Sequence, residues 1–541
     1  MIIATISITH YARRWVTAWM LLCLVGCTVI GPDYVAPPSV ALPQEWNAEQ
    51  ATAQASASTE WWQLFEDPTL NTLIELGASQ NLSLEAAGLR IVQARAALGI
   101  SDALLFPQQQ QVRGNLTKAY QNEQSFNAAG VGLDVGWEMD IWGKYARGIE
   151  LSEANLYASI ASYREVLVTI TAEIARNYIN YRTAQERLSL GLQNIAIQER
   201  VVEMTQVQYD SGNVSELDVQ QARTQLYATQ AAQPSLEIAR LQAGNALAVL
   251  LGTLPRQVEE LLKAEEHPKP PDFDDRMAQA STKSAEDDTF INDYKLRSVI
   301  PAPPALEHAI DPNLVRRRPD LQVAELQAQA QSARIGLSQA ELYPQFFLFG
   351  SIGLSDTVPS GDSFSVSNAV TANIGPGFSW NIFQYDRVKN QVRIEDARFQ
   401  ESLTNYNQKV LAAVREVSDA LVAYEYSRQQ AEFNFSAVQA AIRAFSISAT
   451  QYDNGLVTYQ RLLSTVEKMT LREDSYALTR GKIANNLVAL YKALGGGWEA
   501  HSEHPLVRPE VIKQMKARTD WGDYLAPETL RGDDRGLQDA P

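Results

Sequence analysis

Cysteine is almost absent from this chain of 541 residues, which holds only Cys23 and Cys27. Both lie near the N-terminus, and we expect Cys23 to leave with a cleaved leader. The mature chain then has no pair of thiols for a disulfide, although it is exported to an oxidising compartment. Its stability must come from packing and assembly.

Long apolar runs and an excess of positive charge are missing as well. After the N-terminal segment no stretch approaches about 18 consecutive apolar residues, so we expect no membrane-spanning helix. The formal net charge is −17, which argues against a nucleic-acid partner because phosphates call for clustered Lys and Arg. Any crossing of a bilayer would have to be made by β-strands.

The sequence also lacks a recognisable chemical site. It has no phosphate-binding Gly-Lys-Ser/Thr loop. His501 and His504 lie three residues apart but have no acidic or thiol partners at zinc-like spacing. We therefore expect no enzyme, with no catalytic, cofactor-binding or metal-binding residue.

The first 27 residues predict export and lipidation. Two arginines precede an apolar run from Trp15 to Val25, roughly the length of a signal-peptide core. The run ends in a small residue followed by Cys27, the pattern of a bacterial lipobox. Cleavage after residue 26 would free Cys27 to carry covalent lipid, a diacylglycerol and an N-acyl chain. Thr28 replaces the Asp of the inner-membrane retention cue, which favours the outer membrane of a Gram-negative bacterium. An ordinary secretory signal with a chance cysteine is the alternative.

The chain is written twice. Three residues recur 243 positions later and two recur 237 positions later, as Trp137/Trp380, Tyr181/Tyr424, Leu251/Leu494, Gly99/Gly336 and Pro107/Pro344. The six-residue difference falls between Gln108 and Trp137, where a loop would tolerate it. One unit has been duplicated, and it reads as helix, β-hairpin, long helix, turn, long helix.

A strict alternation precedes each repeated tryptophan. Apolar residues occupy every second position over 131–141 and over 370–382. Period two over about 11 residues fits a tilted transmembrane strand. Asp134, Glu138 and Asp140 would lie on the polar face, towards a lumen, where they would bias ion selectivity. Partner strands are expected near 108–117 and 345–354.

Four strands cannot close a barrel, and open edges are not tolerated in lipid. Three copies would supply 12 strands, an allowed even number. This favours a trimer, although counting alone leaves a tetramer open. An amphipathic sheet in a soluble sandwich is the alternative.

The remaining segments predict long helices. No proline lies between Pro107 and Pro234 or between Pro376 and Pro505. From Lys144 to about Tyr209 the chain is rich in good helix formers, which would make a rod of about 90–100 Å. A return helix follows each Tyr-Asp-x-Gly segment. Antiparallel rods of this length suit the wall of a tunnel.

Several short motifs, in this order, resemble the TolC/NodT family of outer-membrane factors, specifically its lipoprotein branch. They are Gly31–Pro37 after the lipobox, Trp61-Trp62, Asp67-Pro68, Arg316–Leu321 at the second repeat, and the two Tyr-x-x-Gly turns. The resemblance covers roughly residues 27–500.

The resemblance implies a mixed α/β membrane protein. Its fold is a TolC-like homotrimer with a 12-stranded outer-membrane β-barrel, four strands per protomer, continued by a long periplasmic α-helical barrel. The expected divisions are a signal peptide (1–26), a lipidated extended segment (27–60), the first repeat (61–255), a linker (256–315) with an acidic insertion at 262–300, the second repeat (316–497) and a polar tail (498–541). Hairpin strands are expected at about 106–141 and 344–383, and tip turns at about 209–216 and 452–459.

It also implies a function, that of the outer-membrane channel of a tripartite efflux pump. The trimer would be a passive duct that exports small molecules and is gated at its periplasmic tips. Its partners would be a periplasmic adaptor (membrane fusion) protein, an inner-membrane transporter of the resistance-nodulation-division type, and outer-membrane lipid. The residues expected to contact the adaptor are Tyr209, Gly212, Val214, Tyr452, Gly455 and Val457.

The gate follows from the same resemblance. In the family, acidic residues just beyond each tip ring a constriction, and Asp218 matches that position in the first repeat. The second repeat has Ser464 there, flanked by Arg461 and Glu467, so the charges of the ring are open. Solvated charges on helix faces are the alternative for all four residues.

A lipid-tethered, periplasm-spanning coiled-coil protein without a channel is the competing function. In that case the two hairpins would pack in a soluble cap.

Overall fold

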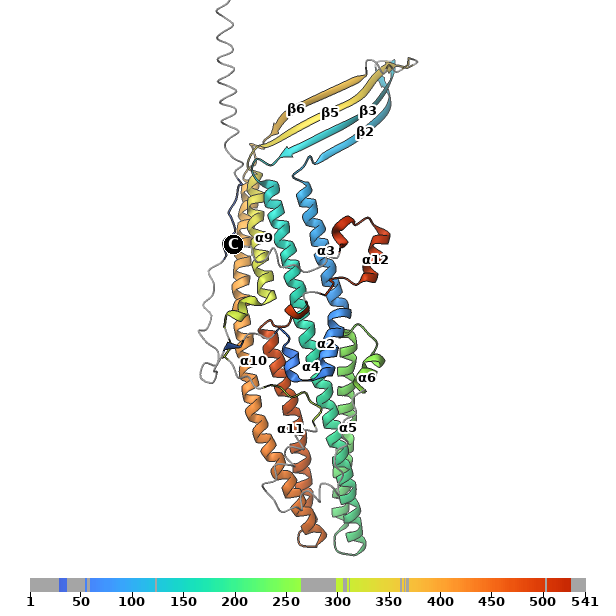
Figure 1. The fold of residues 1–541 in the computed structure, drawn as a ribbon, viewed down its shortest axis with the longest axis vertical. Helices are drawn as coiled ribbons and strands as arrows, with labels where there is room; N and C mark the ends of the chain where they lie inside the picture. The colour runs from blue at the N-terminus through green and yellow to red at the C-terminus, as the bar shows by residue number, and fades with distance from the viewer. Residues whose placement is uncertain are drawn as a thin grey trace, which may run out of the picture.

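The computed structural model of the protein describes residues 29–36, 54–55, 59–121, 124–263, 298–304, 309–310, 312–360, 362–363, 365, 369–501 and 504–526. They form an elongated molecule with a four-stranded sheet at one end and two helix tips at the other (Figure 1). The expected signal peptide, the lipidation residue Cys27 and most of the acidic insertion lie outside the described residues.

The duplication governs the helices. The first repeat contains α3 (Leu82–Ala103), α4 (Lys144–Asp210) and α5 (Glu216–Leu250), and the second contains α9 (Pro319–Ala340), α10 (Arg387–Asp453) and α11 (Tyr459–Ala493). Corresponding helices have equal lengths of 22, 67 and 35 residues. The six-residue difference between the repeats is therefore absorbed in the strands and loops between α3 and α4.

The long helices are amphipathic along one stripe. Residues at spacings of three and four in α4, such as Leu167, Ile170, Ile174 and Tyr178, are buried. Neither α4 nor α10 contains a proline that would remove a backbone hydrogen bond. Both features agree with the expected rods, which at 1.5 Å per residue are about 100 Å long.

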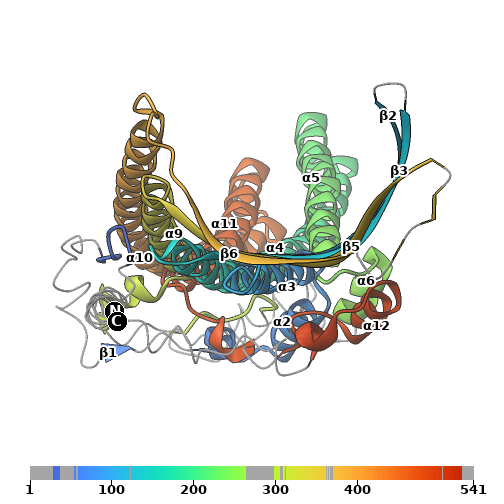
Figure 2. The same ribbon diagram turned by 90° about the horizontal axis from the view of Figure 1, so that it is seen from above.

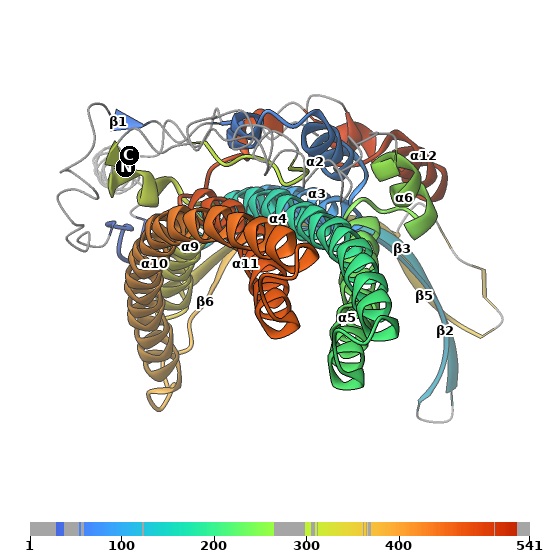
Figure 3. The ribbon, with the colours of Figure 1, turned by 90° about the horizontal axis from the view of Figure 1, so that it is seen from below.

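The helices form one curved layer. Next to the sheet, α9 packs between α10 and α4, and α3 packs on the other side of α4. Towards the tips, α11 takes the place of α9 and α5 takes the place of α3. Seen from above and from below, the layer bends in one direction (Figures 2 and 3).

The sheet contains β2 (Gln109–Gln121), β3 (Gln124–Met139), β5 (Gln345–Pro359) and β6 (Val370–Ser379) in that spatial order. All three strand pairs are antiparallel, and the sheet bends in the same direction as the helix layer (Figure 2). The outer strands β2 and β6 are its edges. Pro376, which cannot donate a backbone hydrogen bond, lies in the edge strand β6.

Short elements cover the convex side of the helix layer at mid-height (Figure 2). They are α2 (Pro68–Gln80), α6 (Pro255–Lys263), α12 (Pro509–Arg518), the parallel pair β1 (Gln54–Ala55) and β4 (Ala309–Ile310), and the 3-10 helices η1 (Trp61–Phe65), η2 (Pro312–Arg317), η4 (Glu499–His501) and η5 (Gly522–Leu525). The main core lies beneath them, and Trp61 stacks on Tyr491 of α11 there at 5.3 Å.

A buried arginine joins the two halves of the second repeat. Arg318 is 8% exposed and donates to the carboxylates of Asp320 and Glu416 and to the Ala493 carbonyl at the end of α11. The Arg-Pro-Asp motif is thus a structural joint between α9, α10 and α11.

Several segments differ from expectation. The partner strands β2 and β5 are longer than predicted, whereas β6 ends at Ser379, before Trp380 and Ile382. The linker begins with the helix α6. The tail, expected to be a polar extension, buries Leu506, Val507 and Met515 in the main core, because its few apolar residues lie on one side of a short helix and its flanks.

Candidate functional site

Both helix tips end in the same backbone motif. At the first tip, Gly212 has φ +76, its N–H donates to the Tyr209 carbonyl, and the Asn213 N–H donates to Gln208. At the second tip Gly455 has φ +71, and its N–H and that of Leu456 make the corresponding bonds. These 5→2 and 6→1 bonds are a Schellman motif, whose left-handed position favours glycine. No atom lies within 4 Å of a Cβ built at either glycine, so only the backbone conformation requires glycine there.

The two tips differ in what they expose. Tyr209 is 40% exposed, whereas its counterpart Tyr452 is 4% exposed and stacks edge-on against Tyr459 at 6.1 Å. Val214 and Val457 are half-buried. Two exposed apolar residues beside the turns, Leu217 and Leu456, were not among the expected contacts. An apolar residue inside a solvent-facing turn was the signal that could have identified them.

Tyr452 and Tyr459 belong to a second apolar cluster near the tips. The cluster combines both repeats, with residues of α4, α5, α10 and α11: Ile197, Val201, Ala222, Phe445, Ala449, Tyr452, Tyr459, Leu462, Leu463, Val466 and Met469. The second tip is therefore packed against the helices of the first repeat within one protomer.

Asp218 has a local structural role. Its Oδ2 accepts hydrogen bonds from the Ser215 backbone N–H at 2.9 Å and from the Ser215 hydroxyl at 2.8 Å, which caps the start of α5. The carboxylate also lies near the second tip. Burial raises the pKa of Tyr459, and Tyr452, Asp218 and Glu467 raise it further through their charge. The fold thus brings the gate candidates Asp218 and Glu467 towards one tyrosine.

The other gate candidates share a helix face. Arg461, Ser464 and Glu467 are spaced by three residues along the first turns of α11, so they form a stripe. Arg461 and Glu467 are exposed, and Ser464 is half-buried. The opposite face of these turns is buried in the second cluster, which directs the stripe away from the protomer's core.

The strand register separates the sheet into two faces. Residues paired across the strands share a face, and one face carries Val112, Leu116, Val131, Leu133, Val135, Trp137, Leu348, Ile352, Leu354, Val370, Ile374 and Phe378. The other carries Arg113, Asp134, Glu138, Ser351 and Asn373, with Phe347 and Phe349 among them. The apolar face is continuous across four strands, and many of its side chains are exposed in the protomer.

The two strand acids have basic partners that the sequence did not indicate. Arg113 of β2 lies 3.1 Å from the Asp134 carboxylate. Lys144, at the start of α4, lies 2.9 Å from Glu138, which also accepts from the Tyr145 hydroxyl. The Arg113 pairing follows from a hairpin turn at residues 122–123, so locating that turn would have revealed it. Because both acids are paired, their effect on ion selectivity is reduced.

Asp140 lies outside the strand in which it was expected. β3 ends at Met139, and both carboxylate oxygens of Asp140 accept backbone hydrogen bonds, from Tyr145 at 3.1 Å and Ala146 at 2.9 Å. The alternation suggested a longer strand because a helix-capping Asp also follows an apolar residue. Asp140 stabilises the start of α4 in this structure.

The segment after the expected lipidation site is held where the sheet meets the helices. Arg147, 4% exposed, donates to the carbonyls of Ile30 and Gly31 and to the Asp33 carboxylate at 2.8 Å. Gly31 lies against Gly336 of α9 so closely that a Cβ on Gly31 would overlap the backbone. The segment can lie there because neither residue has a side chain.

Two searches of the described part of the chain gave negative results. No described helix is both long and apolar enough to cross a membrane. Among the described residues no three His, Cys, Asp or Glu side chains come together as metal ligands would, and His504 lies 3.2 Å from Glu75.

Comparison with known proteins gives a consistent result. The model of a family described as outer membrane efflux protein matches residues 73–253 and 312–496. The probable outer membrane lipoprotein SilC of Salmonella typhimurium is 26% identical over 488 residues, which cover 88% of this chain and 97% of that protein. Nodulation protein T of Rhizobium leguminosarum bv. trifolii is 27% identical, with 90% and 97% covered. Among solved structures, the outer-membrane channel OprN is 29% identical with a TM-score of 0.74, and 87% of this chain and 99% of that chain are covered.

Proposed function

Because this chain belongs to the outer membrane efflux protein family, we propose that three copies form a passive duct through the outer membrane, gated at the periplasmic tips by partner proteins. The expected resemblance to outer-membrane factors and the expected fold are confirmed. The chain serves as an outer-membrane channel in efflux.

The sheet carries this proposal. Its continuous apolar face suits lipid and its polar face suits a water-filled lumen. Four antiparallel strands leave β2 and β6 running in opposite directions at the two edges. The β6 edge of one copy can therefore pair antiparallel with the β2 edge of the next, and three copies close 12 strands with no free edge.

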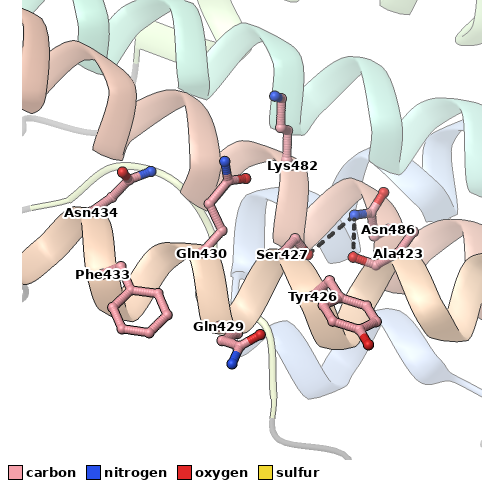
Figure 4. Close-up of a pocket in the computed structure, with 9 residues that line it drawn as sticks. All are labelled: Ala423, Tyr426, Ser427, Gln429, Gln430, Phe433, Asn434, Lys482 and Asn486. Atoms are coloured by element: carbon pink, nitrogen blue, oxygen red, sulfur yellow. Dashed lines mark hydrogen bonds between the residues drawn. The ribbon is translucent and has the colours of Figure 1, made fainter.

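A groove on α10 supports the second copy as the neighbour. The groove has a volume of about 540 Å³ and is lined by Ala423, Tyr426, Ser427, Gln429, Gln430, Phe433, Asn434, Lys482 and Asn486 (Figure 4). Tyr426 and Phe433 are 66% and 69% exposed. Asn486 closes one end, because its side-chain amide donates to the Ala423 carbonyl and to Ser427.

The duplication identifies what fills the groove. Tyr426 corresponds to Thr183 of α4, which lies against Gly481 of α11 within the protomer. The counterpart of Gly481 in the first repeat is Ile238 of α5, which is 55% exposed. We expect α5 of a second copy to lie along the groove with its Ile238 against Tyr426.

The resting gate is placed at the tip charges. Asp218 and the stripe of Arg461, Ser464 and Glu467 lie near the end of the duct, and the proposal pairs Asp218 with Arg461 of a neighbouring tip. The support is positional, because the stripe faces away from the protomer's core and Asp218 retains exposed surface beside its cap.

A conductance experiment with a matched control tests the gate. Asp218→Ala and Arg461→Ala are expected to raise single-channel conductance in planar bilayers, and combining Asp218→Arg with Arg461→Asp is expected to lower it again. Ser215→Ala removes the hydroxyl bond to Asp218 but keeps the charge, so it should conduct like the parent. If Asp218→Ala and Arg461→Ala also conduct like the parent, the gate is elsewhere.

The partners follow from the ends of the duct. The tip turns, with Leu217 and Leu456 exposed beside them, offer an apolar surface to a periplasmic adaptor, and an inner-membrane transporter of the resistance-nodulation-division type would supply the energy. At the other end, Arg147 fixes the chain just after the proposed lipid on Cys27, at the level where the sheet begins. A lipid on Cys27 would enter the same membrane as the strands.

Gel behaviour and mass separate the duct from a tethered coiled coil. The purified, acylated protein is expected to run as a detergent-resistant trimer that dissociates only on heating, and to have the mass of three chains in detergent. A monomer that exposes its sheet to detergent without assembling would favour the coiled-coil alternative.

A further inference from the structure

The segment after the second repeat packs in an ordered way. It lies outside the matched family region, which ends at residue 496. Arg508 binds Glu85 of α3 through two bonds of 3.0 and 2.6 Å, and His504 lies beside Glu75 of α2. A Cβ on Gly88 would overlap the Leu506 backbone. These contacts fix residues 504–526 on the outer side of α3.

The end of this segment lies over one particular glycine. A Cβ on Gly99 of α3 would overlap the Tyr524 hydroxyl, so Tyr524 lies directly on the helix backbone. Gly99 is the counterpart of Gly336 on α9, 237 residues later. On Gly336 the place is taken by Gly31 of the N-terminal segment. The two ends of the chain thus occupy corresponding positions on corresponding helices.

The N-terminal case shows what lies beside that position. Gly31 lies between α9 and α4, where Arg147 of α4 binds its carbonyl. The counterpart of Arg147, 243 residues later, is Asn390 of α10. Arg147 is buried under the N-terminal segment, whereas Asn390 is exposed.

The helix order leaves one flank of α3 without a long neighbour. α9 has α4 on one side and α10 on the other, but among the described residues α3 packs along one long helix only, α4. If repeats alternate around a closed ring, the missing neighbour of α3 is α10 of the next copy. Tyr524 then lies at the seam between two copies, next to the neighbouring Asn390.

The charges at the two surfaces are complementary. Asp520 and Asp523 flank Tyr524, and residues 520–525 contain no basic side chain. Residues 387–394 of α10 contain Arg387, Lys389 and Arg393 and no acidic side chain.

We propose that the C-terminal segment, residues 504–526, is a clamp between copies that is anchored on α3 and binds the first turns of α10 of the adjacent protomer through Tyr524. The inference rests on the proposed trimer. It assigns the tail a role in assembly and places a second copy's residues 387–394 at the surface of η5.

Engineered thiols test the clamp because the chain has no cysteine beyond Cys27. The pair Tyr524→Cys with Asn390→Cys, treated with an oxidant or a short bis-maleimide, is expected to give linked dimers and trimers on a denaturing gel. The single variants and the pair Tyr524→Cys with Leu456→Cys, which joins η5 to the far tip, should remain monomeric on the same gel.

A matched control shows that the reaction works within one copy. The hydroxyls of Ser101 on α3 and Ser152 on α4 are 2.7 Å apart, so Ser101→Cys with Ser152→Cys should lose both free thiols without forming any ladder.

Native mass before treatment separates the two levels of the proposal. A trimeric mass with no ladder from the Tyr524/Asn390 pair, under conditions that close the Ser101/Ser152 pair, would overturn the clamp and leave the duct standing. A monomeric mass would overturn both.

Discussion

Two adjacent residues of β5 test which face of the sheet meets lipid. Ile352 is 58% exposed on the apolar face, paired with Leu133 and Ala372 at the middle of the strand. Ser351 points to the opposite face and pairs with Asp134. Replacing each with Arg introduces the same side chain at nearly the same depth, so the two variants differ only in the face they alter.

The expected costs are well separated. An Arg on the lipid face near the bilayer midplane costs about 2–4 kcal/mol, so three copies lose about 6–12 kcal/mol per trimer. Ser351→Arg adds a cation beside Asp134 in water, and substitutions of that kind usually stay within about 0.5 kcal/mol.

Heat-modifiable trimers isolated from outer membranes provide the assay. Ile352→Arg should strongly reduce their yield and lower the temperature at which they dissociate, while Ser351→Arg should assemble like the parent. The reasoning is refuted if Ser351→Arg fails to assemble and Ile352→Arg is tolerated, since the sheet would then face lipid with its polar side.

Three further changes probe the tips, the tail and the buried joint. Gly455→Val should weaken the second tip by about 1–2 kcal/mol, because only the left-handed backbone is strained, and Gly455→Asn should cost less; hydrogen exchange at the tip measures both, and equal exchange in the two variants would contradict this. The Arg508 side chain holds the pKa of Glu85 below its ordinary 4.5, so this bond stabilises the folded tail above that pH and is lost as the pH falls through the lowered pKa; limited proteolysis should release the tail in acid from the parent, and Glu85→Gln should release it at neutral pH too. Arg318→Ala leaves Glu416 and two other acceptors without their donor and should cost about 2–4 kcal/mol, discounted because Glu416 is half exposed; an unchanged melting temperature would exclude the joint.

The sequence predicted those features that depend on periodicity and repetition. Long proline-free stretches became α4 and α10, and the alternation before Trp137 and Trp380 became the central and edge strands β3 and β6. Even the equal lengths of corresponding helices follow from a constant spacing of 243 residues.

Features that depend on side-chain partners were not predictable in the same way. Asp140 continues the alternation of β3 in sequence, yet a carboxylate placed before a helix binds the free backbone N–H groups at its start. The pairing of Asp134 with Arg113 needs the strand register, which depends on where a hairpin turns. Tyr209 and Tyr452 match in sequence, but only Tyr452 is covered by the other repeat.

The tail shows the same limit from the other side. Its composition is polar, and the residues that hold it, such as Arg508 and Leu506, find partners on α3 more than 400 positions away in the sequence. A composition argument cannot detect contacts that distant.

Single-channel conductance of the purified, acylated trimer in planar lipid bilayers tests the central claim most directly. The account predicts small, discrete steps at rest that grow when Asp218 or Arg461 loses its charge. A trimer that inserts and never conducts, with or without those changes, would contradict a gated duct.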